Sequence, residues 1–268
     1  KDSITEIKKG IKLHSIQTNK FKTNLISVFI TTPLNRENVT KNALIPAILR
    51  RGTKNMPTQE QISKKLEEMY GSEFDCGVEK TGDNQVIKFY LESLNDKFLP
   101  EKEDLLSKSI DVLLEIILNP LVENNMFKTE YLESEKNNLR QLIDSKIDNK
   151  DIYAFEKCTE KMYEGKPYSL YKYGFAEDLE NITNQEIYKY YNELIDTAKI
   201  DIFVSGEFNE KEIIDILNKN ENIAKLKERT PNYVINKEET EIKKDIKNPN
   251  IVEDIMDVTQ GKLVIGME

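Results

Sequence analysis

Side chains that commonly carry catalysis or bind metals are scarce in this sequence of 268 residues. It contains a single histidine, His14, and two cysteines, Cys76 and Cys158, which lie far apart in the chain. A zinc site built on imidazole needs two or three histidines, and a cysteine nucleophile needs a base to form its thiolate. The cysteines also fit no Cys-x-x-Cys spacing. We therefore expect His14 to be a structural residue and both cysteines to be ordinary reduced thiols.

Carboxylates, in contrast, are abundant, and metal sites made only of oxygen ligands exist in proteins. Glu130, Glu133, Glu135 and Asp144 all fall on one predicted helix. Charged residues make up 32% of the chain, so a solvated acidic helix face accounts for them without any ligand. We expect these four side chains to be exposed.

The hydrophobic pattern separates the chain into runs of strands and runs of helices. Alternation before residue 33 predicts two or three antiparallel strands, and a Gly-Asp-Asn turn joins predicted strands 72–79 and 84–92 into a hairpin. A Thr58–Gln61 capping box begins one of the helices. Helices are predicted at 38–49, 59–70, 101–118, 128–146, 151–163, 184–196 and 209–219, and a further strand at 200–205. This order favours an α+β fold over a doubly wound parallel sheet.

Composition limits the classes of partner. Acidic residues outnumber basic ones by 48 to 39, which gives a net charge of −9 and argues against nucleic acid as a partner. No stretch of eighteen apolar residues is present, and the first ten residues lack the apolar core of a signal peptide. The sequence therefore predicts a cytoplasmic protein with no membrane association.

A series of four segments resembles the pitrilysin/insulinase metallopeptidases, the inverzincins with an H-x-x-E-H motif. The segments are NALIPAILRRGTKNMPTQEQISKKLEEMYGSEFDC, ESEKNNLRQLID, PYSLYKYGFAEDLENITNQEIYKYYNEL and KIDIFVSGEFNE, and they cover residues 5 to about 220 in the order found in the family. The resemblance implies a domain at 1–220 with a mostly antiparallel sheet of about six strands and helices packed on one face. It also implies a charged linker at 221–257 and the start of a second, truncated similar domain at 258–268.

The zinc site of that family is missing here. Its two histidines and its general-base glutamate correspond to Ala43, Ala47 and Pro46, and its third ligand, a glutamate on a later helix, corresponds to Leu142. Zinc needs three or four nitrogen, sulfur or oxygen donors, and none of these four side chains supplies one. The resemblance therefore implies a member without catalytic residues and without a metal or other cofactor.

The peptide-binding part of the family's site does not depend on those residues. Family members hold substrate as an added strand along the edge strand that follows the second helix, through backbone hydrogen bonds. That strand corresponds to residues 73–79, and the predicted peptide-binding residues are Glu73, Phe74, Asp75, Cys76 and Gly77. Phe74 and Asp75 differ from the small polar pair that the family usually has there.

The favoured interpretation is a catalytically inactive subunit that binds or encloses an extended peptide. It would pair, as a heterodimer, with an active zinc-bearing homologue in peptide or protein processing. Two alternatives stay open: a structural scaffold that binds no substrate, and an active zinc peptidase.

Overall fold

A six-stranded sheet forms the centre of the protein, for which the computed structural model describes residues 2–235 and 250–267. The strand order is β1-β2-β8-β3-β5-β4. The strands are β1 (Asp2–Lys8), β2 (Ile11–Gln17), β3 (Thr23–Pro33), β4 (Glu73–Thr81), β5 (Asn84–Leu94) and β8 (Lys199–Gly206). Neighbouring strands run antiparallel except β2 and β8, which are parallel. Two very short strands, β6 (Val122–Glu123) and β7 (Met126–Phe127), form a separate ribbon.

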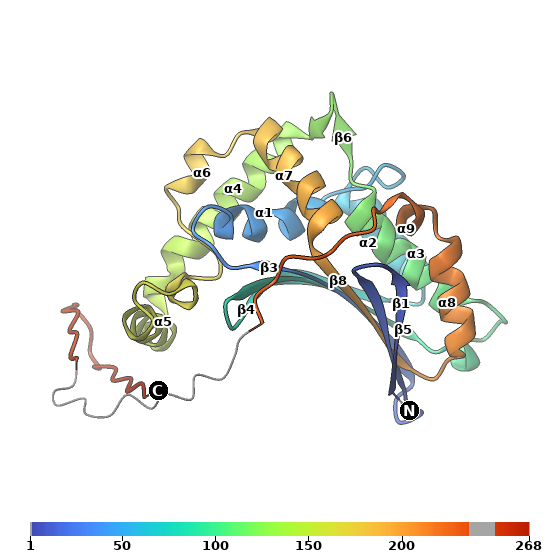
Figure 1. Cartoon of the computed structure of the whole chain (residues 1–268), viewed down its shortest axis with the longest axis horizontal. Coiled ribbons are helices and arrows are strands. Elements are labelled where there is room, and N and C mark those ends of the chain that lie inside the picture. The colour runs from blue at the N-terminus through green and yellow to red at the C-terminus, as the bar shows by residue number, and fades with distance from the viewer. Residues whose placement is uncertain (1, 236–249, 268) are drawn as a thin grey trace.

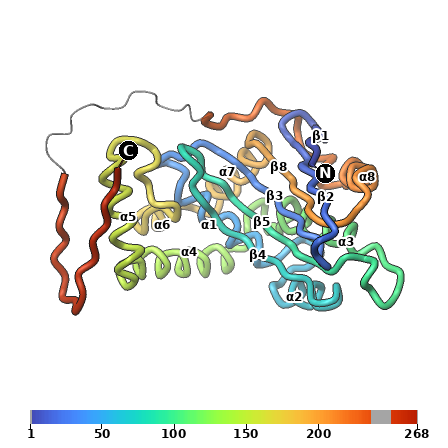
Figure 2. The backbone as a smooth tube through the Cα atoms, turned by 90° about the horizontal axis from the view of Figure 1, so that it is seen from below, coloured from blue at the N-terminus to red at the C-terminus, as the bar shows by residue number. Residues whose placement is uncertain are grey.

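The sheet is arched, and most helices lie on its convex side, above it in Figure 1. The α-helices are α1 (Val39–Leu49), α2 (Gln59–Glu68), α3 (Leu105–Leu118), α4 (Thr129–Asp144), α5 (Lys150–Met162), α6 (Asp178–Asn181), α7 (Asn184–Thr197), α8 (Glu210–Lys219) and α9 (Glu221–Lys225). Short 3-10 turns occupy Asp96–Phe98, Ser145–Asp148 and Pro167–Ser169. Figure 2 looks at the opposite, concave face, where the strands lie in front of the helices.

The core lies between the sheet and these helices, because alternate strand residues point toward the helical layer. Strands β3 and β5 contribute Ile26, Val28, Ile30, Ile87, Phe89 and Leu91, all buried. Their helical partners include Leu44 of α1 and Leu113 of α3, both fully buried. Such burial on one face of a largely antiparallel sheet leaves the other face free to be wet or covered by another element.

The predicted fold class is confirmed: the sheet has six strands, is mostly antiparallel and carries its helices on one side. The predicted capping box is also present, with Thr58 and Gln61 hydrogen-bonded to each other's backbone amides. One detail was not anticipated. Strands β2 and β3 run antiparallel but do not pair, because β8 returns late in the chain and inserts between them.

The chain beyond α8 was predicted to be a charged linker, yet the structure has the short helix α9 at its start. After α9, residues 226–235 run across one end of the sheet, from the β1–β2 turn to the β4–β5 turn. Residues 250–267 lie beside α5, where Lys262 pairs with Asp151 at 3.0 Å (Figure 2). Residues 261–267, within the predicted start of a second domain, form no strand in the part of the chain that the structure describes. Among the described helices, none is long and apolar enough to cross a membrane.

Candidate functional site

Helix α1 carries the three positions predicted for the zinc histidines and the base. Ala43 and Ala47 stand one turn apart on the same helix face, because residues four apart lie above one another. Pro46 lies inside the helix, where its ring nitrogen can donate no hydrogen bond to the preceding turn. The three side chains offer only methyl groups and a pyrrolidine ring.

Leu142, predicted at the third ligand position, lies near the end of α4 and is 43% exposed. With Leu142, all four predicted positions lack a donor atom for a metal, so these residues do not fit zinc. The described residues also contain no group of three or more His, Cys, Asp or Glu side chains that could hold a metal ion.

The acidic side chains of α4 are not all solvated, which corrects one sequence prediction. Glu130, Glu133 and Asp144 are exposed as expected, but Glu135 is buried, with 7% of its surface accessible. Glu135 accepts a hydrogen bond from the guanidinium of Arg51, just beyond the end of α1. A signal for its burial was present in the sequence, because Glu135 falls on the same helical stripe as the buried Leu132 and Leu139.

The turn that follows α1 is fastened to two other helices. Arg51 contacts α4, and the buried Thr53 donates a hydrogen bond of 2.6 Å from its hydroxyl to Glu115 of α3. Between them, Gly52 packs so closely that an added Cβ would lie 2.4 Å from the carbonyl oxygen of Pro57. Only a residue without a Cβ allows this approach.

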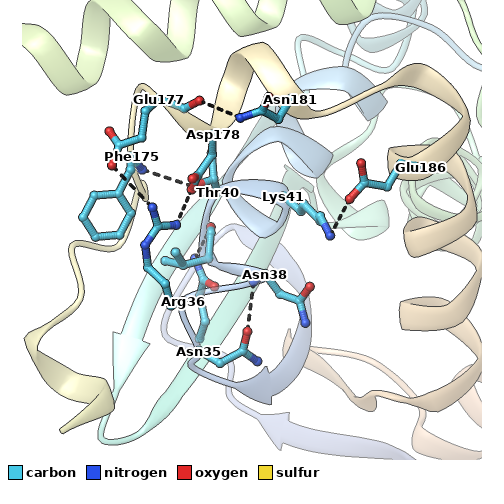
Figure 3. A network of polar contacts seen from close by, with 12 residues as sticks. Asn35, Arg36, Asn38, Thr40, Lys41, Phe175, Glu177, Asp178, Asn181 and Glu186 are labelled. Atoms are coloured by element: carbon cyan, nitrogen blue, oxygen red, sulfur yellow. Dashed lines mark hydrogen bonds and ion pairs between the residues drawn. The ribbon is translucent and has the colours of Figure 1, made fainter. Parts of the chain in front are cut away.

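The first turn of α1 is anchored by a second polar network (Figure 3). The guanidinium of Arg36 donates to Asp178 at 2.6 Å and lies over the ring of Phe175, 3.9 Å from its centroid. Thr40 donates its hydroxyl hydrogen to Asp178 at 2.5 Å and accepts one from the backbone amide of Phe175. Gly174, at φ +75°, leaves room for Thr40. Both ends of α1 are therefore fixed by side chains.

Burial alone would raise the pKa of Asp178. The hydrogen bonds from Arg36 and Thr40, together with the charges of Arg36 and Lys41, outweigh that effect and hold the pKa below its ordinary value of 3.8. The carboxylate form is therefore favoured in the folded chain.

Strand β4, predicted to be the peptide-binding strand, lies at an edge of the sheet. It pairs with β5 on one side, and within residues 2–235 and 250–267 no strand pairs with its other side. Glu73 and Asp75 are exposed, whereas Phe74 and Cys76 pack against the core below the helices. Gly77 has open space where a Cβ would point. The unpaired side of β4 thus presents backbone groups that an extended chain can pair with.

Cys76 joins this edge to α1. Its thiol donates to the carbonyl oxygen of Pro46, with an Sγ–O distance of 3.4 Å. Burial raises the pKa of the Cys76 thiol to about 12, an effect that Asp75 and Glu135 add to and Arg50 opposes. The thiolate needed for nucleophilic catalysis is therefore disfavoured.

His14 is remote from Cys76. It lies on β2, four strand spacings from β4, which is about 19 Å at roughly 4.8 Å per strand. Its Nε2 is 2.8 Å from an oxygen of Asp201, and its ring stacks on Phe203 at 4.2 Å. The imidazole is a hydrogen-bonded structural residue, as predicted, and the fold does not bring it to Cys76.

No model of a known protein family matches the chain. The probable inactive metalloprotease YmfF of Bacillus subtilis is 33% identical over 257 residues, covering 96% of this chain and 59% of that protein. The chain is a pitrilysin/insulinase-like metallopeptidase homologue. A conserved protein from Enterococcus faecalis V583 has a crystal structure that superposes on it with a TM-score of 0.78 and 28% identity, covering 86% of this chain and 54% of the other.

The mitochondrial-processing peptidase subunit beta of Dictyostelium discoideum is 21% identical over 256 residues. The match covers 94% of the pitrilysin/insulinase-like chain and 48% of the subunit. The pitrilysin/insulinase-like chain thus spans between 48% and 59% of the curated relatives that it matches. The resemblance stated from the sequence is confirmed.

Proposed function

We propose that this chain is a non-catalytic subunit that binds extended peptide at the β4 edge and pairs with an active, zinc-bearing homologue. The observation that carries the proposal is the composition of the α1–α4 site. Ala43, Pro46, Ala47 and Leu142 stand where the resemblance places two histidines, a base and a glutamate. Without donor atoms there, neither a metal nor an activated water can be held.

The proposed lack of catalysis agrees with the name of the Bacillus subtilis relative, a probable inactive metalloprotease. Peptide binding is supported by the position of β4, whose outer side meets no strand in the described residues. Backbone pairing along Glu73, Phe74, Asp75, Cys76 and Gly77 supplies affinity that needs no catalytic residue. Pairing with a second chain is supported by the matched mitochondrial peptidase, which is itself named as a subunit.

Metal content and hydrolysis test the loss of catalysis. Elemental analysis of the purified chain should find no stoichiometric zinc, and an unstructured peptide should remain uncut with or without a chelator. The matched control is the variant Ala43→His/Ala47→His/Leu142→Glu, in which three donors return to the two helices and zinc binding should appear. Stoichiometric zinc with chelator-sensitive cleavage in the unaltered chain would refute the proposal.

Hydrogen exchange tests the peptide site. Adding an unstructured peptide should slow amide exchange in residues 73–77 of β4 and leave β1, the opposite edge of the sheet, unchanged. Protection of neither edge would favour a scaffold that binds no substrate, and equal protection of both edges would contradict binding at β4 in particular.

The partner is tested by purification from the native cell. A homologue with an intact H-x-x-E-H motif should copurify with the chain, and cell fractionation should place the pair in the cytoplasm, as the sequence predicts. Recovery of this chain without such a homologue would count against the paired assembly.

A further inference from the structure

Arg51 and Glu135 connect α1 and α4, the two helices that carry the predicted zinc-ligand positions Ala43, Ala47 and Leu142. The Nε of Arg51 donates to one carboxylate oxygen of Glu135, and its Nη2 donates to the hydroxyl of Ser134 at 3.0 Å. The other carboxylate oxygen of Glu135 accepts from the side-chain amide of Asn138 at 3.2 Å. Both oxygens of this carboxylate are therefore satisfied by side chains of α4 and of the turn after α1.

The pair is shielded from water. The side chain of Glu135 is 9% exposed and that of Arg51 is 26% exposed. A buried carboxylate that loses its cationic partner is left with an uncompensated charge, so this contact constrains the distance between the helices more firmly than a surface pair does.

The pair also lies close to the β4 edge. Cys76 of β4 bonds to the carbonyl of Pro46, in the last turn of α1 before Arg51. Glu135 and Arg50 both act electrostatically on the Cys76 thiol. The end of α1, the middle of α4 and the middle of β4 therefore meet in one region.

We propose that the Arg51–Glu135 pair is a positioning contact that takes over the mechanical role of a metal bridge between α1 and α4, and thereby holds β4 in place for peptide. The resemblance places zinc ligands on these two helices, and Ala43, Ala47 and Leu142 cannot connect them. Arg51 and Glu135 make that connection with an ion pair instead. The peptide part of this inference rests on the proposed function; the positioning of β4 does not.

The test uses isosteric or conservative changes in the whole chain. Glu135→Gln keeps the size of the side chain and removes its charge, and Arg51→Met keeps much of the length and removes the guanidinium. Each should raise exchange rates in residues 73–77 about tenfold and weaken binding of a peptide from a casein digest by about the same factor, equivalent to roughly 1.4 kcal/mol. Arg51→Lys, which retains the charge, should give intermediate values.

Arg36→Met is the matched control, because it breaks the ion pair at the other end of α1. It should leave exchange in β4 and peptide affinity within about twofold of the unaltered chain. If Arg51→Met does not fold, Glu135→Gln and Arg51→Lys carry the comparison.

Three outcomes decide the matter. Faster β4 exchange with Glu135→Gln but not with Arg36→Met supports the inference. A lower melting temperature with unchanged β4 exchange overturns it, because the pair is then a general stabilising contact. If the unaltered chain binds no peptide, the proposed function fails, while the exchange rates in β4 still decide the role of the pair.

Discussion

At the scale of single residues, the side chains at the predicted zinc positions carry no donor atoms. Methyl groups at Ala43 and Ala47 cannot ligate a metal, and the one nearby thiol, Cys76, is directed at a helix carbonyl. Among the ionisable groups of the region, Arg51 and Glu135 form an ion pair. What persists around α1 is a set of packing and positioning contacts.

The thiol of Cys76 should be chemically inert. With a pKa of about 12 instead of 9.0, its thiolate fraction at pH 8 is roughly a thousandfold smaller than that of an ordinary thiol. In a Cys158→Ser variant, alkylation by iodoacetamide, followed by mass spectrometry, should be slower by about that factor in the folded chain than in guanidinium chloride. Equal rates in the two conditions would show that the thiol is neither buried nor held by Pro46.

At the scale of elements, α1 is held by contacts that begin outside the helix. Its N-cap residue, Asn38, provides no capping hydrogen bond from its side chain. Instead, Thr40 and Arg36 engage Asp178 of α6, far along the chain (Figure 3). The first turn of α1 is therefore held by the segment before α7.

The contact with Asp178 should make stability depend on pH. Because its pKa is lowered in the folded chain, Asp178 contributes stability above its ordinary value of 3.8 and loses it as the pH falls through the folded value. Asp178→Asn should lower the free energy of unfolding at pH 7 by about 1 kcal/mol, since Arg36 is half exposed. That deficit should shrink below about pH 4.

Denaturant titrations from pH 7 to pH 3 measure this difference. Glu177→Gln is the control. The Glu177 side chain is 71% exposed, and its distance of 3.4 Å from an Arg36 guanidinium nitrogen to a carboxylate oxygen is longer than the 2.6 Å between Arg36 and Asp178. A deficit for Asp178→Asn that stays constant over this range would mean that the carboxylate charge is not the stabilising feature.

At the scale of the whole molecule, residues 226–235 cross one end of the sheet and are hydrogen-bonded to the turns at both of its edges. Arg229 is 6% exposed, and its backbone amide donates to Lys9 in the β1–β2 turn. At the other end, Asn84 exchanges two hydrogen bonds with the backbone of Val234, at 2.7 and 2.8 Å. Residues 226–235, part of the predicted linker 221–257, thus pack against the sheet, and residues 236–249 of that segment lie outside the described residues.

Breaking the Asn84 contact should expose this segment to protease. In the unaltered chain, trypsin should cleave slowly after Arg229, because that side chain is buried. Asn84→Ala should accelerate this cleavage by about tenfold, since loss of two hydrogen bonds costs about 1–3 kcal/mol locally. Asn209→Ala, which removes a helix cap elsewhere, should not accelerate it; if it does so equally, the effect is global unfolding.

The sequence by itself determined the seven longer helices, most strands and the absence of zinc donors at the predicted ligand positions. Periodicity, capping residues and turn residues act between neighbours in the chain, so the helix that carries Ala43 and Ala47 and the edge-forming hairpin of β4 and β5 were predictable. Only the tertiary structure decided that β8 inserts between β2 and β3, and that Arg51 meets Glu135 across 84 residues. Such contacts join residues that are distant in the sequence and form only when the chain folds. Local sequence patterns do not specify which distant residues then come together.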